Sequence, residues 1–193
     1  MTKLGINPEA VIFQLKVSLF GIQPEIWRRL LIPGNMKLDM LHETIQGAMG
    51  WKDEHLHEFV IEGTTYGDPD NPPHGSFTSE RGTKTKLKFL GLKPGDRFIY
   101  QYDFGDDWMH EVLVEQILEP VPKETYPQCV AGERACPPED CGGPPGYEHL
   151  LHVLQNPGDP QYNDLLEWVD GPFDPDAFDA NTYRWLPIML TYS

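Results

Sequence analysis

Long hydrophobic runs and a disulfide framework are both missing from this chain of 193 residues. No apolar stretch approaches the roughly 20 residues that a membrane-spanning helix needs, and residues 1–8 lack the apolar block of a secretory signal. Only three cysteines are present, and an odd number in such a sequence argues against a set of structural disulfides. We therefore expect a cytoplasmic protein that has no membrane partner.

Basic residues are scarce in the second half of the chain. Residues 101–193 contain 3 of the 15 lysines and arginines but 18 of the 30 acidic residues, so this half accounts for the whole net charge of −15. An acidic surface repels phosphate backbones, which disfavours direct nucleic-acid binding. Arg28, Arg29 and Lys37 still leave room for a small basic patch in the first half. Solubility alone is the ordinary explanation of such acidity.

Hydrophobic periodicity predicts an α+β fold. Apolar and polar residues alternate in several segments, as in half-buried strands, and one segment has helical spacing and is followed by Gly50. The expected elements are strands over 11–20 and 26–32, a helix over 38–49, and strands over 55–61, 97–103 and 108–118. We predict a mixed or antiparallel sheet built from hairpins, in the order ββαβ…ββ, with one helix packed on it.

Proline and glycine mark the irregular parts of the chain. Residues 67–82 show no periodicity and predict a long loop. Residues 119–146 are rich in proline and glycine and contain all three cysteines, so we expect an irregular connector there. Further helices are expected over 147–155, over 164–169 and from 174 towards 186. The whole chain, 1–193, is then one α+β domain, with its core at 11–118, the connector at 119–146 and a helical part at 147–193.

The hairpin at residues 100–110, YQYDFGDDWMH, is the first candidate site, because aromatic residues alternate into a Gly/Asp turn. A two- or four-residue loop places Asp103 opposite Trp108 and His110 diagonally across from Asp103, roughly 7–8 Å away. A three-residue loop would put Asp103 on the other face of the hairpin. A carboxylate beside an imidazole can fix its tautomer or join it on a metal ion. The alternative is that Asp103 only serves the backbone of its own turn.

The three cysteines form a second candidate site. Three thiolates and one imidazole are a suitable tetrahedral set for zinc. The candidate ligands are Cys129, Cys136 and Cys141, with His110, His57 or His149 as the fourth. Their spacing differs from the Cys-x2-Cys pairs of zinc ribbons, so thiols that simply pack beneath a proline-rich loop are the alternative. A catalytic thiol is less favoured, because Arg134 is the one nearby basic residue that would lower its pKa.

An acidic pair, Glu139 and Asp140, lies between two prolines and the segment that begins at Cys141. These carboxylates can cap a local turn, or they can face the same cleft as Asp103. In a shared cleft, carboxylates and histidines support a divalent ion or general acid–base chemistry. The candidate catalytic residues are therefore His57, Asp103, Asp106, His110, Glu139 and Asp140, and the candidate metal ligands are Cys129, Cys136, Cys141 and His110.

Several segments share the motifs of one known family. They are PEIWRR at 24–29, GAMGW at 47–51 with HLHEF at 55–59, the hairpin at 100–110, and CPPEDCGG at 136–143, preceded by Tyr126-Pro127-x-Cys129 and followed by Gly146-Tyr147. Together they resemble the plasmid pRiA open-reading-frame-three-like family over roughly residues 11–186. The motif positions are Trp27, Arg28, His57, Asp103, Gly105, Asp106, Trp108, His110, Pro138, Glu139 and Asp140.

The resemblance implies a small protein of bacterial or archaeal chromosomes, plasmids and mobile elements, with no established activity. Some relatives are labelled as transposon passengers or resolvases. A resolvase must hold DNA, and the acidic charge and the lack of a basic DNA-reading element argue against that activity. The resemblance marks the motif positions as important without giving them roles.

Two functional hypotheses follow. The first is a binding or accessory module whose acidic, aromatic-lined cleft recognises a protein or a small molecule. The alternative is a metal-dependent hydrolase that uses zinc or another divalent ion. Structural zinc without catalysis is compatible with the first hypothesis. Convergence of His57, His110 and Glu139 on one open cleft would favour the enzyme.

Overall fold

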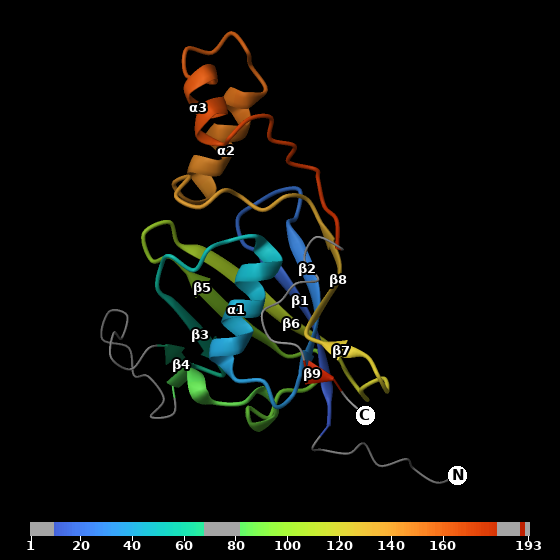
Figure 1. Cartoon of the computed structure of the whole chain (residues 1–193). Coiled ribbons are helices and arrows are strands. Elements are labelled where there is room, and N and C mark those ends of the chain that lie inside the picture. The colour runs from blue at the N-terminus through green and yellow to red at the C-terminus, as the bar shows by residue number, and fades with distance from the viewer. Residues whose placement is uncertain (1–9, 68–81, 181–189, 192–193) are drawn as a thin grey trace.

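A seven-stranded antiparallel sheet carries the fold in the computed structural model, which describes residues 10–67, 82–180 and 190–191 (Figure 1). The strand order is β4-β3-β5-β6-β1-β2-β8. The strands are β1 (Ile12–Leu19), β2 (Trp27–Pro33), β3 (His57–Ile61), β4 (Thr64–Gly67), β5 (Arg97–Tyr102), β6 (Trp108–Leu118) and β8 (Gln128–Glu133). The sheet and its helices confirm the predicted α+β class.

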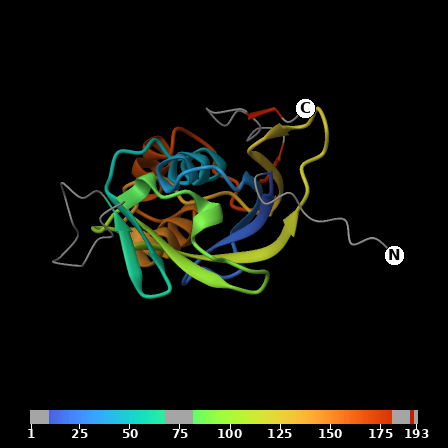
Figure 2. The ribbon, with the colours of Figure 1, turned by 90° about the horizontal axis from the view of Figure 1, so that it is seen from below.

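One helix covers the sheet, and two others stand apart from it. Helix α1 (Leu38–Met49) packs on one face of the curved sheet, as the view from below shows (Figure 2). Its bounds match the expected ones, and Gly50 ends it in the left-handed conformation, with φ of 83°. Helices α2 (Gly143–Leu154) and α3 (Tyr162–Trp168) form a lobe beyond one end of the sheet (Figure 1). None of the described helices is long and apolar enough to cross a membrane.

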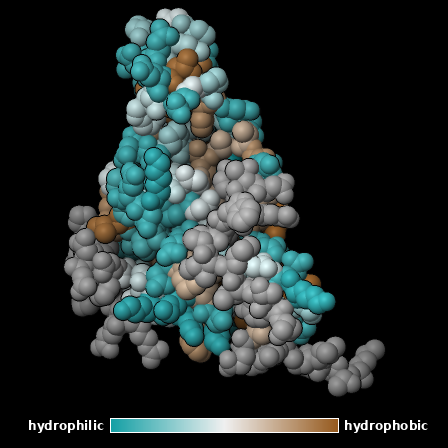
Figure 3. All heavy atoms as spheres, viewed as in Figure 1, coloured by the Kyte–Doolittle hydropathy of each residue, from teal (hydrophilic) through white to brown (hydrophobic). Residues whose placement is uncertain are grey.

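Short elements complete the described chain. The described residues before β5 include the 3₁₀ turns η2 (Gly82–Lys84) and η3 (Leu87–Phe89). Strand β7 (Thr125–Tyr126) pairs with β9 (Leu190–Thr191) in a small second sheet. The face seen in Figure 3 is mostly hydrophilic, with hydrophobic residues showing in the lobe and just below it.

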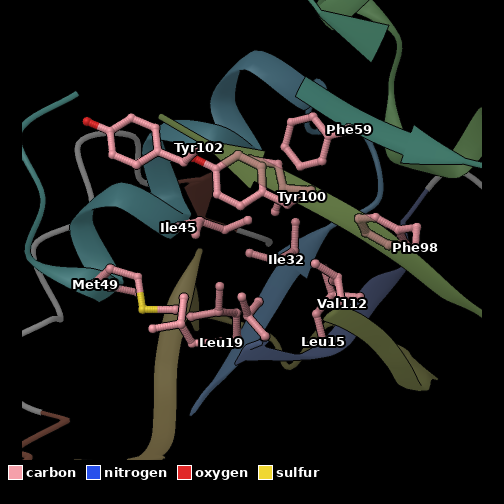
Figure 4. Close-up of a cluster of buried hydrophobic side chains, with 14 of the residues drawn as sticks. Leu15, Leu19, Ile32, Ile45, Met49, Phe59, Phe98, Tyr100, Tyr102 and Val112 are labelled. Carbon is pink, nitrogen blue, oxygen red and sulfur yellow. The ribbon is translucent and has the colours of Figure 1, made fainter. Parts of the chain in front are cut away.

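The core lies between α1 and the sheet (Figure 4). The alternation in β1 places Leu15 and Val17 inside, while α1 contributes Ile45 at helical spacing. Tyr100 and Tyr102 follow each other on the same face of β5 and are fully buried alongside α1. This aromatic part of the core leads directly to the end of the sheet where the candidate residues lie.

The connector expected to be irregular contains a strand of the main sheet, and this expectation was wrong. Strand β8 pairs antiparallel with β2, because the run from Gln128 to Glu133 contains no proline and alternates Cys129 inward with Val130 outward. Gly132 is required within it, since a Cβ there would lie 2.6 Å from the ring of Phe178. The pairing extends the sheet beyond β2 and leads the chain from there to the candidate site.

Other boundaries also differ from the expected ones. Strand β4 was missed, and α2 begins at Gly143, ahead of the expected 147, because prolines fit the first turn of a helix. Residues 174–180 are not helical as expected. The rest of that expected helix, beyond residue 180, lies outside the described residues. So do residues 68–81 of the loop expected over 67–82, whose end residues belong to β4 and η2.

Candidate functional site

Three loops meet at one end of the sheet. The first, residues 50–56, joins α1 to β3, the second is the turn between β5 and β6, and the third leads from β8 to α2. Trp51 connects the first loop to the third, because its indole nitrogen donates a hydrogen bond of 2.9 Å to the carbonyl oxygen of Pro137. Asp106 connects the second to the third by accepting a 3.0 Å hydrogen bond from the backbone N–H of Gly142.

The turn between β5 and β6 spans five residues, Asp103 to Asp107, and this length sets the register of the hairpin. Tyr102 therefore pairs with Trp108, so the expected pairing of Asp103 with Trp108 was wrong. Asp103 has a φ of 54°, and its Oδ1 accepts the backbone N–H groups of Gly105 (2.9 Å) and Asp106 (3.3 Å). One oxygen of this carboxylate thus holds the turn, as the backbone alternative predicted.

The second oxygen of Asp103 faces a histidine that the sequence had not placed in the candidate set. Oδ2 lies 3.7 Å from Nε2 of His55, and the same nitrogen lies 3.1 Å from Oδ1 of Asp140. The ligand atoms of these three residues all lie within 4.8 Å of one another. The side chain of Asp103 is nearly buried, while those of His55 and Asp140 are 31% and 62% exposed. This is an open group of one imidazole and two carboxylates.

Glu139 binds the backbone and the aromatic wall of the site. Its Oε1 accepts a 2.5 Å hydrogen bond from the hydroxyl of Tyr102, and its Oε2 accepts the N–H of Lys52 at 2.9 Å. The Tyr102 oxygen in turn accepts the N–H of Glu54. Burial, together with the negative charge of Glu139, raises the pKa of Tyr102 well above its usual value. Tyr102 therefore stays protonated and acts as the donor to Glu139.

His110 lies inside the protein and His57 is partly buried, and neither belongs to the open group. His110 is fully buried, with Nδ1 at 3.2 Å from the carbonyl oxygen of Tyr100. Burial lowers the pKa of His110 to about 4 and that of His57 to about 3. Among the described contacts no hydrogen bond or ion pair joins His110 to Asp103, so the expected pair does not form. Both imidazoles are neutral near pH 7.

The candidate zinc ligands are not brought together either. No three of Cys129, Cys136, Cys141 and His110 have ligand atoms within 4.8 Å of one another, although all four residues are described. The sulfur of Cys136 instead lies 2.9 Å from the buried guanidinium of Arg28 and 3.0 Å from the sulfur of Met49. A buried cation beside a thiol opposes metal binding there, and burial raises the pKa of Cys136 to about 11. Burial likewise raises the pKa of Cys141 to about 12.

A buried polar group that the sequence prediction missed lies beneath the first loop. It contains His42 and Gln46 of α1, Asp53 of the loop and Tyr100 of β5, joined by hydrogen bonds of 2.7–3.1 Å. The signal was present in the sequence, because His42 falls between Leu41 and Ile45 on the apolar stripe of α1. A polar residue on a buried stripe needs a partner. His57 stacks on His42, with ring centroids 3.4 Å apart.

Two surface depressions border the three loops. One, of about 450 Å³, lies between the first and third loops and the lobe. Its lining residues include Trp51, Lys52, Glu54, Glu139, Asp140, Trp168, Asp170 and Phe173. We call this depression the lobe cleft. The other, of about 510 Å³, is the turn groove, lined by residues 53–56 and 103–105. The open group of His55, Asp103 and Asp140 lies between the two.

The fold and the site define a sheet-and-helix protein with an acidic, aromatic-lined end. The chain belongs to the plasmid pRiA4b ORF-3-like protein family, whose sequence profile matches residues 11–182. It is 36% identical to the uncharacterized protein y4hQ of Sinorhizobium fredii (strain NBRC 101917 / NGR234) over 150 residues. The aligned residues make up 77% of this chain and 75% of that protein. It is also similar to the crystal structure of a protein of unknown function, MM3350 from Methanosarcina mazei Go1, with 38% identity, a TM-score of 0.80, and coverage of 90% and 96% of the two chains.

Proposed function

We propose that this protein is a binding module that recognises a basic segment of a partner protein in the lobe cleft. The observation that carries the proposal is the lining of this cleft, which combines four carboxylates with three aromatic rings and one lysine. The carboxylates are those of Glu54, Glu139, Asp140 and Asp170, and the rings are those of Trp51, Trp168 and Phe173.

The charge of the cleft selects the sign of the ligand. Four acidic residues and one basic residue give this surface a net negative charge, and the second half of the chain adds to the same field. Lysine and arginine side chains are attracted to such a surface, whereas phosphate groups are repelled. Nucleic acid is therefore a poor candidate for the cleft, and a basic peptide segment is a good one.

The aromatic rings provide the second part of the recognition. Trp168 is 47% exposed on α3, although a large apolar ring is ordinarily covered by its own protein. A guanidinium or ammonium group gains about 0.5–2 kcal/mol when it lies over an aromatic face. Carboxylates that border such rings let a cation pair with charge and with an aromatic face at once. This combination distinguishes the cleft from an acidic surface that serves solubility alone.

Fluorescence anisotropy with labelled peptides tests the proposal. We expect arginine- and lysine-rich peptides to bind at low ionic strength, and peptides of equal length with glutamine in place of each basic residue not to bind. Binding should weaken as salt is added, because exposed charges are screened. Trp168→Ala and Asp170→Asn should each weaken it several-fold, roughly 1 kcal/mol for each lost contact.

The matched controls change the same kinds of residue elsewhere on the surface. Phe89→Ala removes an aromatic ring that is 66% exposed and lies outside the lobe cleft. Glu119→Gln removes an exposed acidic side chain that directly follows β6 and does not line the cleft. Both variants should bind like the parent protein. Equal binding of the basic and glutamine peptides, or equal losses in the control variants, would refute the proposal.

Metal-dependent hydrolysis is the second candidate function, because His55, Asp103 and Asp140 form an exposed group with mutually close ligand atoms. Imidazole and carboxylates suit a divalent ion with free positions for water. Hydrolysis of activated phosphate or acyl esters that depends on Zn²⁺ or Mn²⁺ and is lost in Asp140→Asn would support this candidate. Metal-independent turnover, or turnover that survives this substitution, would exclude it.

A further inference from the structure

A second cluster with ligand-type side chains extends from the core to the surface, between α1 and β3. It consists of His42 on α1, Asp53 in the loop after α1, and His57 at the start of β3. One ring nitrogen of each histidine and one carboxylate oxygen of Asp53 all lie within 4.8 Å of one another. We propose that these three residues bind a divalent transition-metal ion of the zinc type. The site is separate from the lobe cleft and does not depend on the proposed peptide binding.

The first supporting observation is an unsatisfied nitrogen. Nε2 of His57 is buried and has no hydrogen-bond partner among the described residues. An unpaired buried polar atom costs about 1–3 kcal/mol, and such atoms in folded proteins often mark an ion or water that completes the site. The ring lies against that of His42, at 3.4 Å between centroids and 6° between planes. Nε2 of His57 lacks a partner beside the ring of His42, and a metal ion that binds both residues supplies one.

The second observation is the support that holds His42 in place. Its Nδ1 lies 2.7 Å from the hydroxyl of Tyr100, which also accepts a hydrogen bond from Nε2 of Gln46. Its Nε2 lies 2.7 Å from Oδ1 of Asp53, whose backbone N–H binds the side-chain oxygen of Gln46. Nδ1 is thus anchored by Tyr100, and Nε2 points at the carboxylate of Asp53. Metal-binding histidines are oriented by outer partners in the same way.

Both rings are in the protonation state that binds metals. Burial lowers the pKa of His57 to about 3 and also lowers that of His42, with the nearby Asp53 acting in the opposite direction. The contact between His42 and Asp53 is therefore a hydrogen bond that the neutral ring donates from Nε2 to the carboxylate near pH 7. A neutral ring carries a single proton, which lies on Nε2 while that nitrogen donates to Asp53. For an ion to bind at Nε2 the ring must change tautomer, so that the proton lies on Nδ1 and is donated to the Tyr100 oxygen.

The geometry requires one adjustment. The lone pair of each nitrogen lies in its ring plane, so two parallel rings cannot both point at one ion, and the rings must tilt apart. Zinc–nitrogen bonds of about 2.0–2.1 Å put tetrahedral ligand atoms roughly 3.3 Å from one another. The 2.7 Å contact between His42 and Asp53 must therefore widen slightly. Asp53 can move, because its side chain is half exposed and lies on a loop.

The open side of the cluster is the turn groove, which Asp53 lines. Three protein ligands leave at least one position for water from this groove, which is the arrangement of open rather than purely structural zinc sites. Two imidazoles and one carboxylate favour zinc or cobalt over calcium or magnesium, since the latter prefer all-oxygen sets. The exposed group of His55, Asp103 and Asp140 is a weaker candidate, because none of its ligand atoms is a buried, unpartnered nitrogen.

Titration with Co²⁺ tests the site, using the full chain without a histidine tag and first stripped with EDTA. We expect one equivalent of Co²⁺ to bind with visible absorption bands of a low-symmetry site, and Zn²⁺ to displace it. His57→Gln should abolish this spectrum. Asp53→Asn keeps an acceptor for His42 and should weaken Co²⁺ binding at least about tenfold, a change that even outer partners of metal sites produce.

Asp164→Asn is the matched control, since it removes an exposed carboxylate on α3 that belongs to neither metal-ligand group and should leave Co²⁺ binding unchanged. Asp140→Asn tests whether the ion binds at the neighbouring open group instead. Far-ultraviolet circular dichroism of each variant checks that the fold is retained. Absence of stoichiometric Co²⁺ binding would overturn the proposal. So would Asp53→Asn and His57→Gln proteins that bind Co²⁺ like the parent, or binding that is lost in Asp140→Asn alone.

Discussion

The hydroxyl of Tyr102 donates a hydrogen bond of 2.5 Å to Oε1 of Glu139 and thereby ties the last residue of β5 to the loop before α2. The same oxygen accepts the N–H of Glu54 from the loop after α1. One buried tyrosine thus links two of the three loops of the site to the end of the sheet. The packing of Trp51 on this ring, at 5.1 Å between centroids, reinforces the junction.

Removal of this hydroxyl is the first prediction. Tyr102→Phe leaves the carboxylate of Glu139 and the N–H of Glu54 without this partner, so we expect the free energy of unfolding to fall by about 1–3 kcal/mol. Urea unfolding followed by tryptophan fluorescence measures the change. Tyr162→Phe, at a partly exposed position on α3, is the control and should change stability by less than about 0.5 kcal/mol. Equal stabilities of the two variants would contradict the prediction.

Arg28 leads to the second prediction, because it is a fully buried cation held by backbone carbonyls. Its guanidinium donates to the carbonyl oxygens of Ala48, Glu133 and Arg134, and these bonds join the end of α1 to the last residue of β8 and the residue that follows it. Arg28→Met fills much of the volume but orphans these acceptors, so we expect a loss of at least about 3 kcal/mol of stability.

Arg28→Lys should recover only part of that loss, since an ammonium group cannot reproduce the planar fork of donors. Arg97→Met is the control, because Arg97 is half exposed and pairs with Glu111 at 3.4 Å on the surface. We expect it to cost less than about 1 kcal/mol. Thermal unfolding by calorimetry ranks the three variants, and an Arg28→Met protein as stable as Arg97→Met would show that the buried fork is dispensable.

The third prediction concerns the close approach of two loops at Gly143. A Cβ at this position would lie 2.3 Å from the carbonyl oxygen of Asp106, and the residue has a φ of 67°. Gly143→Ala must push the turn of the hairpin away from the start of α2, so we expect a lower melting temperature and weaker peptide binding in the lobe cleft. Gly158→Ala, where no described residue lies within 4 Å of the added methyl group, should change neither. Identical melting curves would be inconsistent with this contact.

Strand β1 and helix α1 were predictable because their sequence signals are local. Apolar alternation in β1 and the Gly50 stop of α1 depend only on neighbouring residues. The register of the hairpin was not predictable, because it depends on a five-residue turn in which Asp103 and Asp107 both adopt positive φ. Because Trp108 pairs with Tyr102 and not with Asp103, the side chain of Asp103 faces His55 instead of His110.

The candidate site was only partly predictable, since its contacts are long-range. The sequence marked Asp103, Glu139 and Asp140, and the structure brings them to one end of the sheet. The histidine partner of Asp103 and Asp140 could not be chosen from spacing alone, because His55 lies in a loop about 50 residues before Asp103. The cysteines led to the prediction of a zinc site because of their spacing in sequence, and their packing in the fold explains why they do not meet. They are close in sequence, but β8 buries Cys129 while Arg28 occupies the space beside Cys136.

Buried histidines also make the stability of the protein depend on pH. Burial lowers the pKa of His57 to about 3 and that of His110 to about 4, whereas an unfolded histidine has a pKa of about 6.5. Above pH 6.5 both the folded and the unfolded chain hold these rings neutral, so their contribution to stability is complete. Below that pH the unfolded chain takes up protons that the folded chain refuses, and stability falls until the folded pKa values are reached.

The fourth prediction is therefore a loss of stability between pH 6.5 and pH 5, measured by urea unfolding in the presence of EDTA. Each such histidine contributes a slope of up to about 1.4 kcal/mol per pH unit. His57→Asn removes one titrating ring, so the dependence of the unfolding free energy on pH should fall by up to about 1.4 kcal/mol per pH unit. This holds whatever stability the variant loses at pH 7. His152→Asn, at an exposed position on α2, should leave the slope unchanged. The range above pH 5 avoids the carboxylates of Glu25 and Glu115, whose pKa values are lowered and whose contribution is lost at more acidic pH. A slope that His57→Asn does not reduce would mean that this ring takes up its proton in the folded protein, against the burial on which the prediction depends.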